Sequence, residues 1–133
     1  MIALIVGMVG WLATIAARNI HARGGVTPAR VLLSCGIVLS IAGAGAGLAG
    51  PWISGLDPQL HSYPAIVWTL AIWTSAHAGV AAIMQSYALA RSLAGKMDPH
   101  HDADLRNVSV YMHFYALTAI VTYATIGLFP EVA

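Results

Sequence analysis

The chain has 133 residues, of which 59% are hydrophobic and only 8% are charged. A soluble domain carries about 25% charged residues, so the composition excludes a soluble globular protein and indicates one that crosses a membrane. The net charge of +1 gives no support for a nucleic-acid partner. The only cysteine, Cys35, excludes an intrachain disulfide and a cysteine metal cluster. We expect it to be a buried small hydrophobic residue.

Four apolar segments follow one another along the chain, and each is long enough to cross a membrane as an α-helix. The predicted helices cover residues 2–18, 29–49, 63–93 and 106–129. The first lacks the positive start and the cleavage pattern of a signal peptide, so we expect it to remain as a spanning helix. The predicted fold class is an all-α membrane bundle of four transmembrane helices, forming a single domain over residues 1–133.

The second predicted helix carries small residues at regular intervals. Gly43 and Gly47 are four residues apart, and Gly36, Ser40 and Ala44 form a second stripe with the same spacing. Small side chains let two helices approach closely in lipid, where no hydrophobic effect drives them together. We therefore expect this helix to have a tightly packed neighbour, with Gly43 and Gly47 in the helix packing.

The basic residues predict the orientation of the helices. All six lie in or beside the loops that follow the first and third helices: Arg18, Arg23, Arg30, Arg91, Lys96 and Arg106. The loop between the second and third helices has none and carries Asp57. Basic loops stay in the cytoplasm, so both termini are expected on the periplasmic side. Trp52, Tyr63 and Phe129 fit interfacial aromatic anchors near the outer ends of the helices.

Two histidines, His77 and His113, each lie within a predicted helix. One interpretation is a pair of axial haem ligands on facing helices. The other is a pair of buried, neutral side chains that form hydrogen bonds between helices or contact lipid headgroups. Measured by helical rise from the inner boundary, the two histidines differ in depth by about 10 Å. This counts against the haem interpretation, because both ligands of one iron lie at one depth.

A short polar segment contains further groups that bind divalent ions, namely His100, His101, Asp102 and Asp104. Adjacent histidines seldom face a single ion, so a solvated polar loop is the better interpretation. The predicted helices contain no Asp or Glu, which counts against an autonomous ion transporter. No nucleophile, histidine and acid are placed for catalysis. We expect neither a catalytic residue nor a metal site in this chain.

The third and fourth helices carry a specific pattern of residues. Tyr63, His77 and Arg91 follow one another at intervals of fourteen residues, and Tyr-Met-His-Phe follows at 111–114. In this order and spacing, the stretch resembles the last two helices of subunit III of the haem-copper cytochrome c oxidases. It is also similar to the subunit III portion of bacterial fused subunit I–III chains. Thr74 stands where the family pattern has a histidine.

The resemblance implies a non-catalytic accessory role in oxygen reduction and proton pumping. Subunit III carries no redox centre, so no cofactor is implied on this chain, and the haem and copper are expected in subunit I. The implied partners are subunit I, with subunit II as a further candidate, and phospholipid, in a bacterial inner membrane. The residues implied in lipid or inter-helix contacts are Tyr63, His77, Arg91, Tyr111 and His113.

Two alternatives remain open at this point. The chain could be a self-contained b-type cytochrome or a quinol-binding membrane bundle, and a Soret band of its own would favour the cytochrome. It could also be an assembly factor, which would be absent from the purified mature oxidase.

Overall fold

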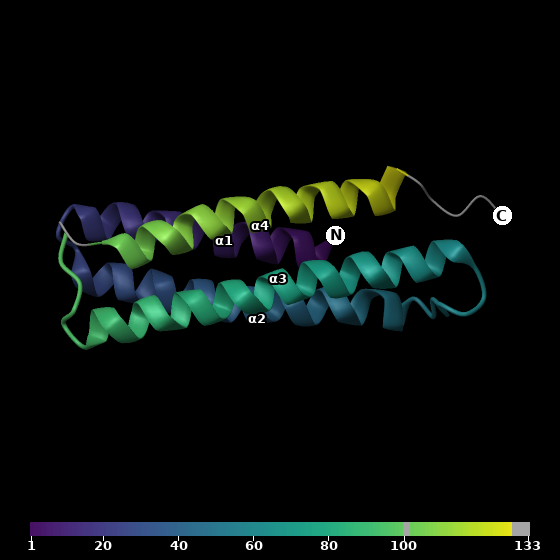
Figure 1. The fold of residues 1–133 in the computed structure, drawn as a ribbon, viewed down its shortest axis with the longest axis horizontal. Helices are drawn as coiled ribbons and strands as arrows, with labels where there is room; N and C mark the ends of the chain where they lie inside the picture. Colours follow the sequence, from purple (N-terminus) through teal and green to yellow (C-terminus); the bar gives the residue numbers. More distant parts are fainter. Residues whose placement is uncertain (100–101, 129–133) are drawn as a thin grey trace.

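The computed structural model describes residues 1–99 and 102–128. Helices make up most of this part of the chain (Figure 1): α1 (Ile2–Ala22), α2 (Val26–Ile53), α3 (Ser62–Leu93) and α4 (Ala103–Leu128). All four are long and apolar enough to cross a membrane. The predicted all-α fold class with four candidate spanning helices is therefore confirmed. His100, His101 and Phe129 lie outside the described residues.

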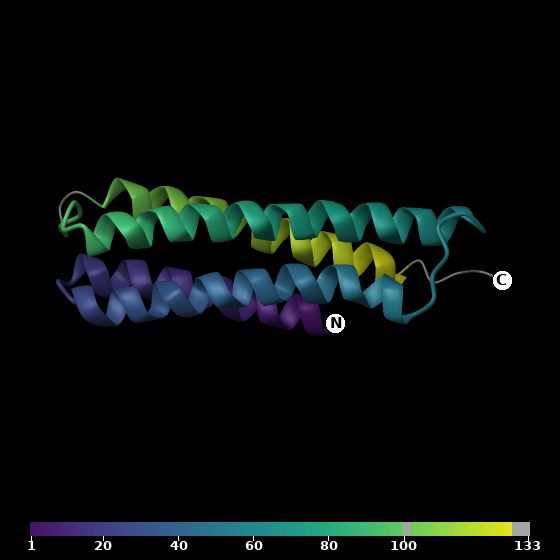
Figure 2. The same cartoon turned by 90° about the horizontal axis from the view of Figure 1, so that it is seen from below.

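The helices run alternately up and down and form a four-helix bundle. α1 packs on α2, α2 on α3, α3 on α4, and α4 on α1, so each helix has two neighbours and one diagonal partner. Two views at right angles show this arrangement (Figures 1 and 2). The turn 23–25 and the connection from α3 to α4 lie at one end of the bundle, which we call the basic end. The loop 54–61 lies at the opposite end, which we call the outer end after the predicted orientation.

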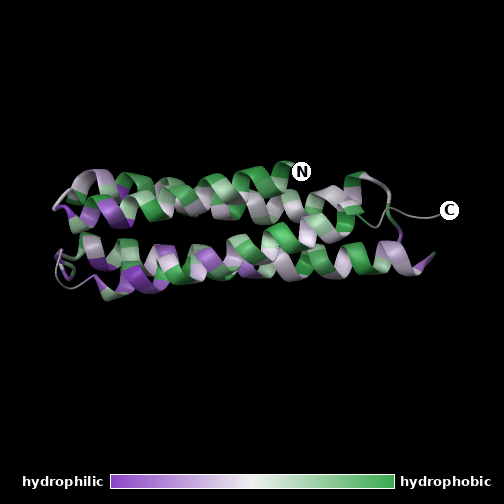
Figure 3. Cartoon of the chain, turned by 90° about the horizontal axis from the view of Figure 1, so that it is seen from above, coloured by the Kyte–Doolittle hydropathy of each residue, from purple (hydrophilic) through white to green (hydrophobic). Residues whose placement is uncertain are grey.

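The distribution of side chains is that of a protein surrounded by lipid. Large apolar residues such as Ile5, Val38 and Leu117 are exposed on the outside, whereas the core is rich in alanine and small polar residues. Hydrophilic residues gather at the basic end (Figure 3). Cys35, expected to be buried, is exposed, because the buried stripe of α2 passes through the next residue, Gly36.

Two helices, α1 and α2, end later than predicted. α1 continues to Ala22, where Gly24 takes a positive φ of 85° and the N–H of Gly25 donates to the carbonyl of Ile20, 3.0 Å away. α2 passes through Pro51 and ends before Gly55, whose φ is 66°. A left-handed glycine and a bond spanning five residues close both helices. Glycine geometry, rather than the first polar residue or proline, sets these ends.

Candidate functional site

The contact between α3 and α4 contains the residues on which the family resemblance rests. A helix turns about 100° per residue, so an interval of fourteen residues returns a side chain to within about 40° of its starting direction. Tyr63, His77 and Arg91 consequently share one face of α3. In the structure this face is directed towards α4, and each of the three residues makes a contact with that helix.

Tyr63 forms the outermost of these contacts. Its hydroxyl donates a hydrogen bond to the backbone carbonyl of Ile126, at 3.2 Å. That carbonyl belongs to the last turn of α4, where the final four carbonyls have no partner within the helix. The tyrosine thus satisfies an end group of α4 and ties it to the start of α3.

His77 forms the middle contact, through an aromatic cluster. Its ring lies 5.3 Å from that of Phe114 and 6.4 Å from that of Tyr111, which it meets nearly parallel. The imidazole Nδ1 lies 2.9 Å from the carbonyl of Trp73, within the same helix. The hydrogen bond that joins the helices here is from the Tyr111 hydroxyl to the backbone carbonyl of His77, at 3.4 Å. Among the described residues, the imidazole of His77 thus meets α4 through ring contacts and not through a hydrogen bond of its own.

Arg91 forms the contact at the basic end. Its Nε lies 2.9 Å from a carboxylate oxygen of Asp104, in the first turn of α4. A second pair joins Arg18 of α1 to Asp102, at 3.8 Å. These carboxylates were predicted to belong to a solvated loop. Instead they meet arginines from two other helices, because α4 begins at Ala103, earlier than predicted, and brings both acids to the helix start.

His113 lies on the other side of α4, away from His77. Its ring meets that of Trp11 from α1 edge-on, at 5.5 Å, and its Nδ1 lies 2.6 Å from the carbonyl of Ser109. Residues 111 and 113 are about 200° apart around a helix, which explains why Tyr111 faces α3 and His113 faces α1. The two histidines therefore point to different helix pairs.

The ring of His77 reaches Tyr111 and Phe114, which flank His113 along α4. Ring contacts of this kind do not fix the levels of the two Cα atoms, so the predicted difference in depth of about 10 Å stays a prediction. The directions of the two side chains are enough to keep the imidazoles from facing each other, because His77 meets α4 and His113 meets α1. Within residues 1–99 and 102–128, no cluster of three or more His, Cys, Asp or Glu side chains forms a candidate metal site.

A polar network at the centre of the bundle was not predicted. The amide nitrogen of Gln85 donates to the Thr14 hydroxyl at 2.7 Å, and the Ser40 hydroxyl donates to the amide oxygen of Gln85 at 3.0 Å. The same amide nitrogen lies 3.7 Å from the sulfur of Met112. All four side chains are fully buried, and each comes from a different helix. An amide within a long apolar run was the signal that could have located it.

The glycines of α2 differ in how closely they are packed. A Cβ atom at Gly36 would lie 2.9 Å from the Thr14 hydroxyl, and one at Gly47 would lie 2.7 Å from the Ser75 hydroxyl. At Gly43 the nearest atom would be the backbone nitrogen of Gly7, at 3.6 Å, which is an ordinary contact. Gly43 thus faces the α1 backbone but has room for a methyl group. Gly36 and Gly47 have no such room.

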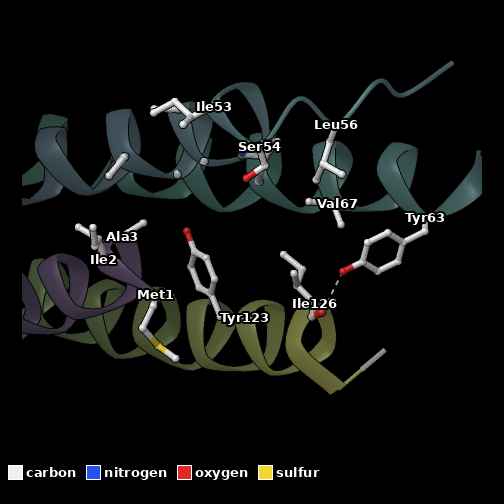
Figure 4. Close-up of a pocket in the computed structure, with 16 residues that line it drawn as sticks. Met1, Ile2, Ala3, Ile53, Ser54, Leu56, Tyr63, Val67, Tyr123 and Ile126 are labelled. Carbon is white, nitrogen blue, oxygen red and sulfur yellow. Dashed lines mark hydrogen bonds between the residues drawn. The ribbon is translucent and has the colours of Figure 1, made fainter. Parts of the chain in front are cut away.

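An apolar cavity of about 610 Å³ opens at the outer end of the bundle, among all four helices. Ala3, Gly47 and Val67 line its walls together with Tyr63 and Tyr123. The Tyr123 hydroxyl points into it, while that of Tyr63 is bonded to Ile126 (Figure 4). Within the described part of the chain, the Tyr123 hydroxyl has no hydrogen-bond partner. The cavity has the size and lining of a site for an apolar ligand with one polar group.

Comparison with known proteins gives no assignment, since no family model matches the chain and no curated protein matches it. Conclusions about function therefore come from the residues and their arrangement.

Proposed function

We propose that this chain is a non-catalytic accessory subunit, similar to subunit III, of a haem-copper terminal oxidase. The observation that carries the proposal is the α3–α4 contact. Tyr63, His77 and Arg91, which recur at the intervals of the subunit III pattern, all make their contacts with the helix that holds the rest of that pattern. In this role the chain packs against subunit I, which carries the haem and copper, and supports oxygen reduction and proton pumping without a redox centre of its own.

The charges support a defined orientation, and the resemblance to the subunit III portion of bacterial chains supports a bacterial inner membrane. The lysine and arginine residues are at the end that holds the turn 23–25. In the outer loop 54–61, Asp57 is the only Asp, Glu, Lys or Arg. Basic loops remain in the cytoplasm. In this orientation α1 starts and α4 ends on the periplasmic side.

Two features support phospholipid binding as part of this role. The cavity at the outer end is apolar and suits an acyl chain. At the basic end, Arg23, Lys96 and Arg106 are exposed, and cations near a membrane surface attract anionic headgroups.

The first test is to purify the complex that contains this chain in mild detergent, and to record its optical spectrum and subunit masses. We expect a large haem- and copper-containing subunit to purify with the chain, and no haem to stay on the chain after the two are separated. Haem on the isolated chain would reject the proposal in favour of a b-type cytochrome. Absence of the chain from the mature oxidase would instead favour an assembly factor.

Arg91→Ala provides a second test within the purified complex. Loss of the contact with Asp104 is expected to lower the amount of chain or phospholipid retained per haem, while the haem spectrum stays unchanged. Arg23→Ala, which removes an exposed arginine from the turn between α1 and α2, is the matched control for the amount of chain retained; it is not used for the phospholipid content, because Arg23 is itself proposed to attract headgroups. A shifted haem spectrum in Arg91→Ala would place this residue close to a redox centre and count against an accessory role.

A second candidate function, quinol binding, is favoured by the Tyr123 hydroxyl that points into the apolar cavity. A quinone has a ring oxygen that accepts such a hydrogen bond and an apolar tail that fits an apolar lining. A photoreactive quinone analogue would then label the chain, and Tyr123→Phe would reduce labelling. Tyr87→Phe, at an exposed tyrosine near the basic end, is the control that leaves labelling unchanged.

A further inference from the structure

The outward surface of α4 carries polar atoms far from the ends of the helices. Val110, Phe114 and Leu117 are exposed along it, with fractions of 65%, 49% and 63%. His113 lies on one side of this row, and His77 of α3 lies on the other, beside Phe114. We call these five residues the α4 outer face.

Both histidines are far from the ends of the bundle. His77 lies fifteen residues from Ser62 and sixteen from Leu93, the two ends of α3. At about 1.5 Å per residue, more than 20 Å of helix separates it from either end. His113 lies ten residues from Ala103 and fifteen from Leu128, the two ends of α4. The hydrocarbon core of a bilayer is about 30 Å thick, so both imidazoles lie within it if these helices span it.

Each imidazole has one nitrogen satisfied and one left over. Nδ1 of His77 lies within hydrogen-bond distance of the Trp73 carbonyl, and Nδ1 of His113 has the same relation to the Ser109 carbonyl. A carbonyl only accepts, so both Nδ1 atoms carry the proton and both Nε2 atoms are acceptors when the rings are neutral. Neither Nε2 has a hydrogen-bond partner among the described residues. Acyl chains have no donors, so leaving these acceptors in lipid is costly.

The outward surface of α2 provides a contrast on the same molecule. Its exposed residues include Cys35 and Val38, and the hydroxyl of its exposed Ser34 donates to the Arg30 carbonyl at 2.9 Å. The polar group there is satisfied within the helix, so the surface suits lipid. The α4 outer face differs from this surface of α2, because it carries two acceptors that have no hydrogen-bond partner among the described residues.

We propose that the α4 outer face docks against transmembrane helices of the haem-copper subunit, which supply O–H or N–H donors to Nε2 of His77 and of His113. The inference rests on the proposed function and names the surface by which the chain joins its partner. The bulky Phe114 lies between the two histidines and forms the centre of the contact.

Site-specific crosslinking in the purified complex tests the location of the interface. Phe114→Cys, combined with Cys35→Ser, places a single thiol on the α4 outer face, and the native Cys35 provides a matched thiol on α2. Each is labelled with benzophenone maleimide and illuminated. We expect the thiol at position 114 to give an adduct with the large haem-copper subunit, and Cys35 to give none. An adduct from Cys35 alone, an adduct with a second copy of this chain, or adducts with lipid alone would overturn the inference.

Exchange of the acceptors tests the hydrogen bonds. The double variant His77→Phe with His113→Phe keeps two rings but removes both Nε2 atoms, whereas His77→Gln with His113→Gln keeps an acceptor at each position. The loss of two bonds is expected to reduce the chain retained per haem after a detergent wash by about tenfold, and the Gln variant should retain most of it. Equal retention of both variants, with unchanged helix content by circular dichroism, would overturn the role of the histidines.

These outcomes separate the two proposals. If the unaltered chain does not purify with a haem-copper subunit, the proposed function and the docking surface both fail. If it does, but position 114 gives no adduct with that subunit, only the docking surface fails.

Discussion

The side-chain amide of Gln85 in α3 donates a hydrogen bond of 2.7 Å to the hydroxyl of Thr14 in α1. These two helices are diagonal to each other in the bundle, so their backbones have little direct contact. Ser40 of α2 completes the arrangement by donating to the oxygen of the same amide. One side chain thereby connects three helices at a point that water does not reach.

Gln85 and Thr14 are expected to be energetically coupled. Hydrogen bonds between membrane helices contribute about 1 kcal/mol, and removing one partner leaves the other buried and unsatisfied. Gln85→Leu and Thr14→Val should each lower the free energy of unfolding in detergent micelles, and the double variant should lose less than the sum of the two. Unfolding followed by circular dichroism measures all four proteins. Strict additivity would mean that this bond contributes nothing to stability.

Alanine at two glycines of α2 should have opposite effects. A methyl group at Gly36 meets Thr14 and Gln85 at 2.9 and 3.1 Å, so Gly36→Ala disturbs the central network and should destabilise the protein by about 1–3 kcal/mol. Gly43→Ala has room for its methyl group and should be neutral or stabilising by up to about 1 kcal/mol, because alanine favours a helix more than glycine does. Thermal unfolding of the two variants provides the comparison. A reversed order would contradict the packing described here.

The pair of Arg91 and Asp104 should hold the first turn of α4. Arg91→Glu places two acids together and should speed hydrogen exchange of the backbone amides after Asp104, whereas adding Asp104→Arg should restore slow exchange. Exchange followed by mass spectrometry measures this segment directly. Arg106→Glu, in the same turn of α4 but exposed, controls for a change of charge alone. The prediction is wrong if the reversed pair exchanges as fast as the single variant.

Trp68 should hold the outer loop in place. Its indole nitrogen donates to the carbonyl of Leu56 at 2.7 Å, and its ring meets that of Trp52 edge-on at 6.4 Å. Trp68→Phe removes the donor at a cost of about 1 kcal/mol and should expose the loop 54–61 to faster proteolysis. Trp52→Phe keeps an aromatic ring for the contact and should be cleaved at the rate of the unaltered protein. Equal cleavage of all three proteins would show that the indole bond does not restrain the loop.

Much of the fold could be predicted because long apolar runs leave few alternatives in a chain with so little charge. The third helix was predicted almost to the residue, since Pro64 fits a first turn and Arg91 marks the last. The ends of α1 and α2 were missed for one physical reason. Each helix continues through polar or proline residues until a glycine adopts a positive φ, and composition does not reveal which glycine does so.

The contacts of individual side chains were less predictable than the helices. A spacing of fourteen residues placed Tyr63, His77 and Arg91 on one face. Their partners depend on how α4 is rotated about its axis. The apolar and polar residues of α4 are spread around that axis, so the sequence does not predict which face turns towards α3. Gln85 was missed because a single amide scarcely changes the hydropathy of its segment, although it contacts three other helices.

The three-residue turn 23–25 has a consequence for biogenesis. We expect that a connection this short makes α1 and α2 enter the bilayer together, as one hairpin. Thr14 and Ser40, the two hydroxyl partners of Gln85, would then be in place when α3 arrives, and hydrogen bonds from both to the same amide would favour one rotation of α3.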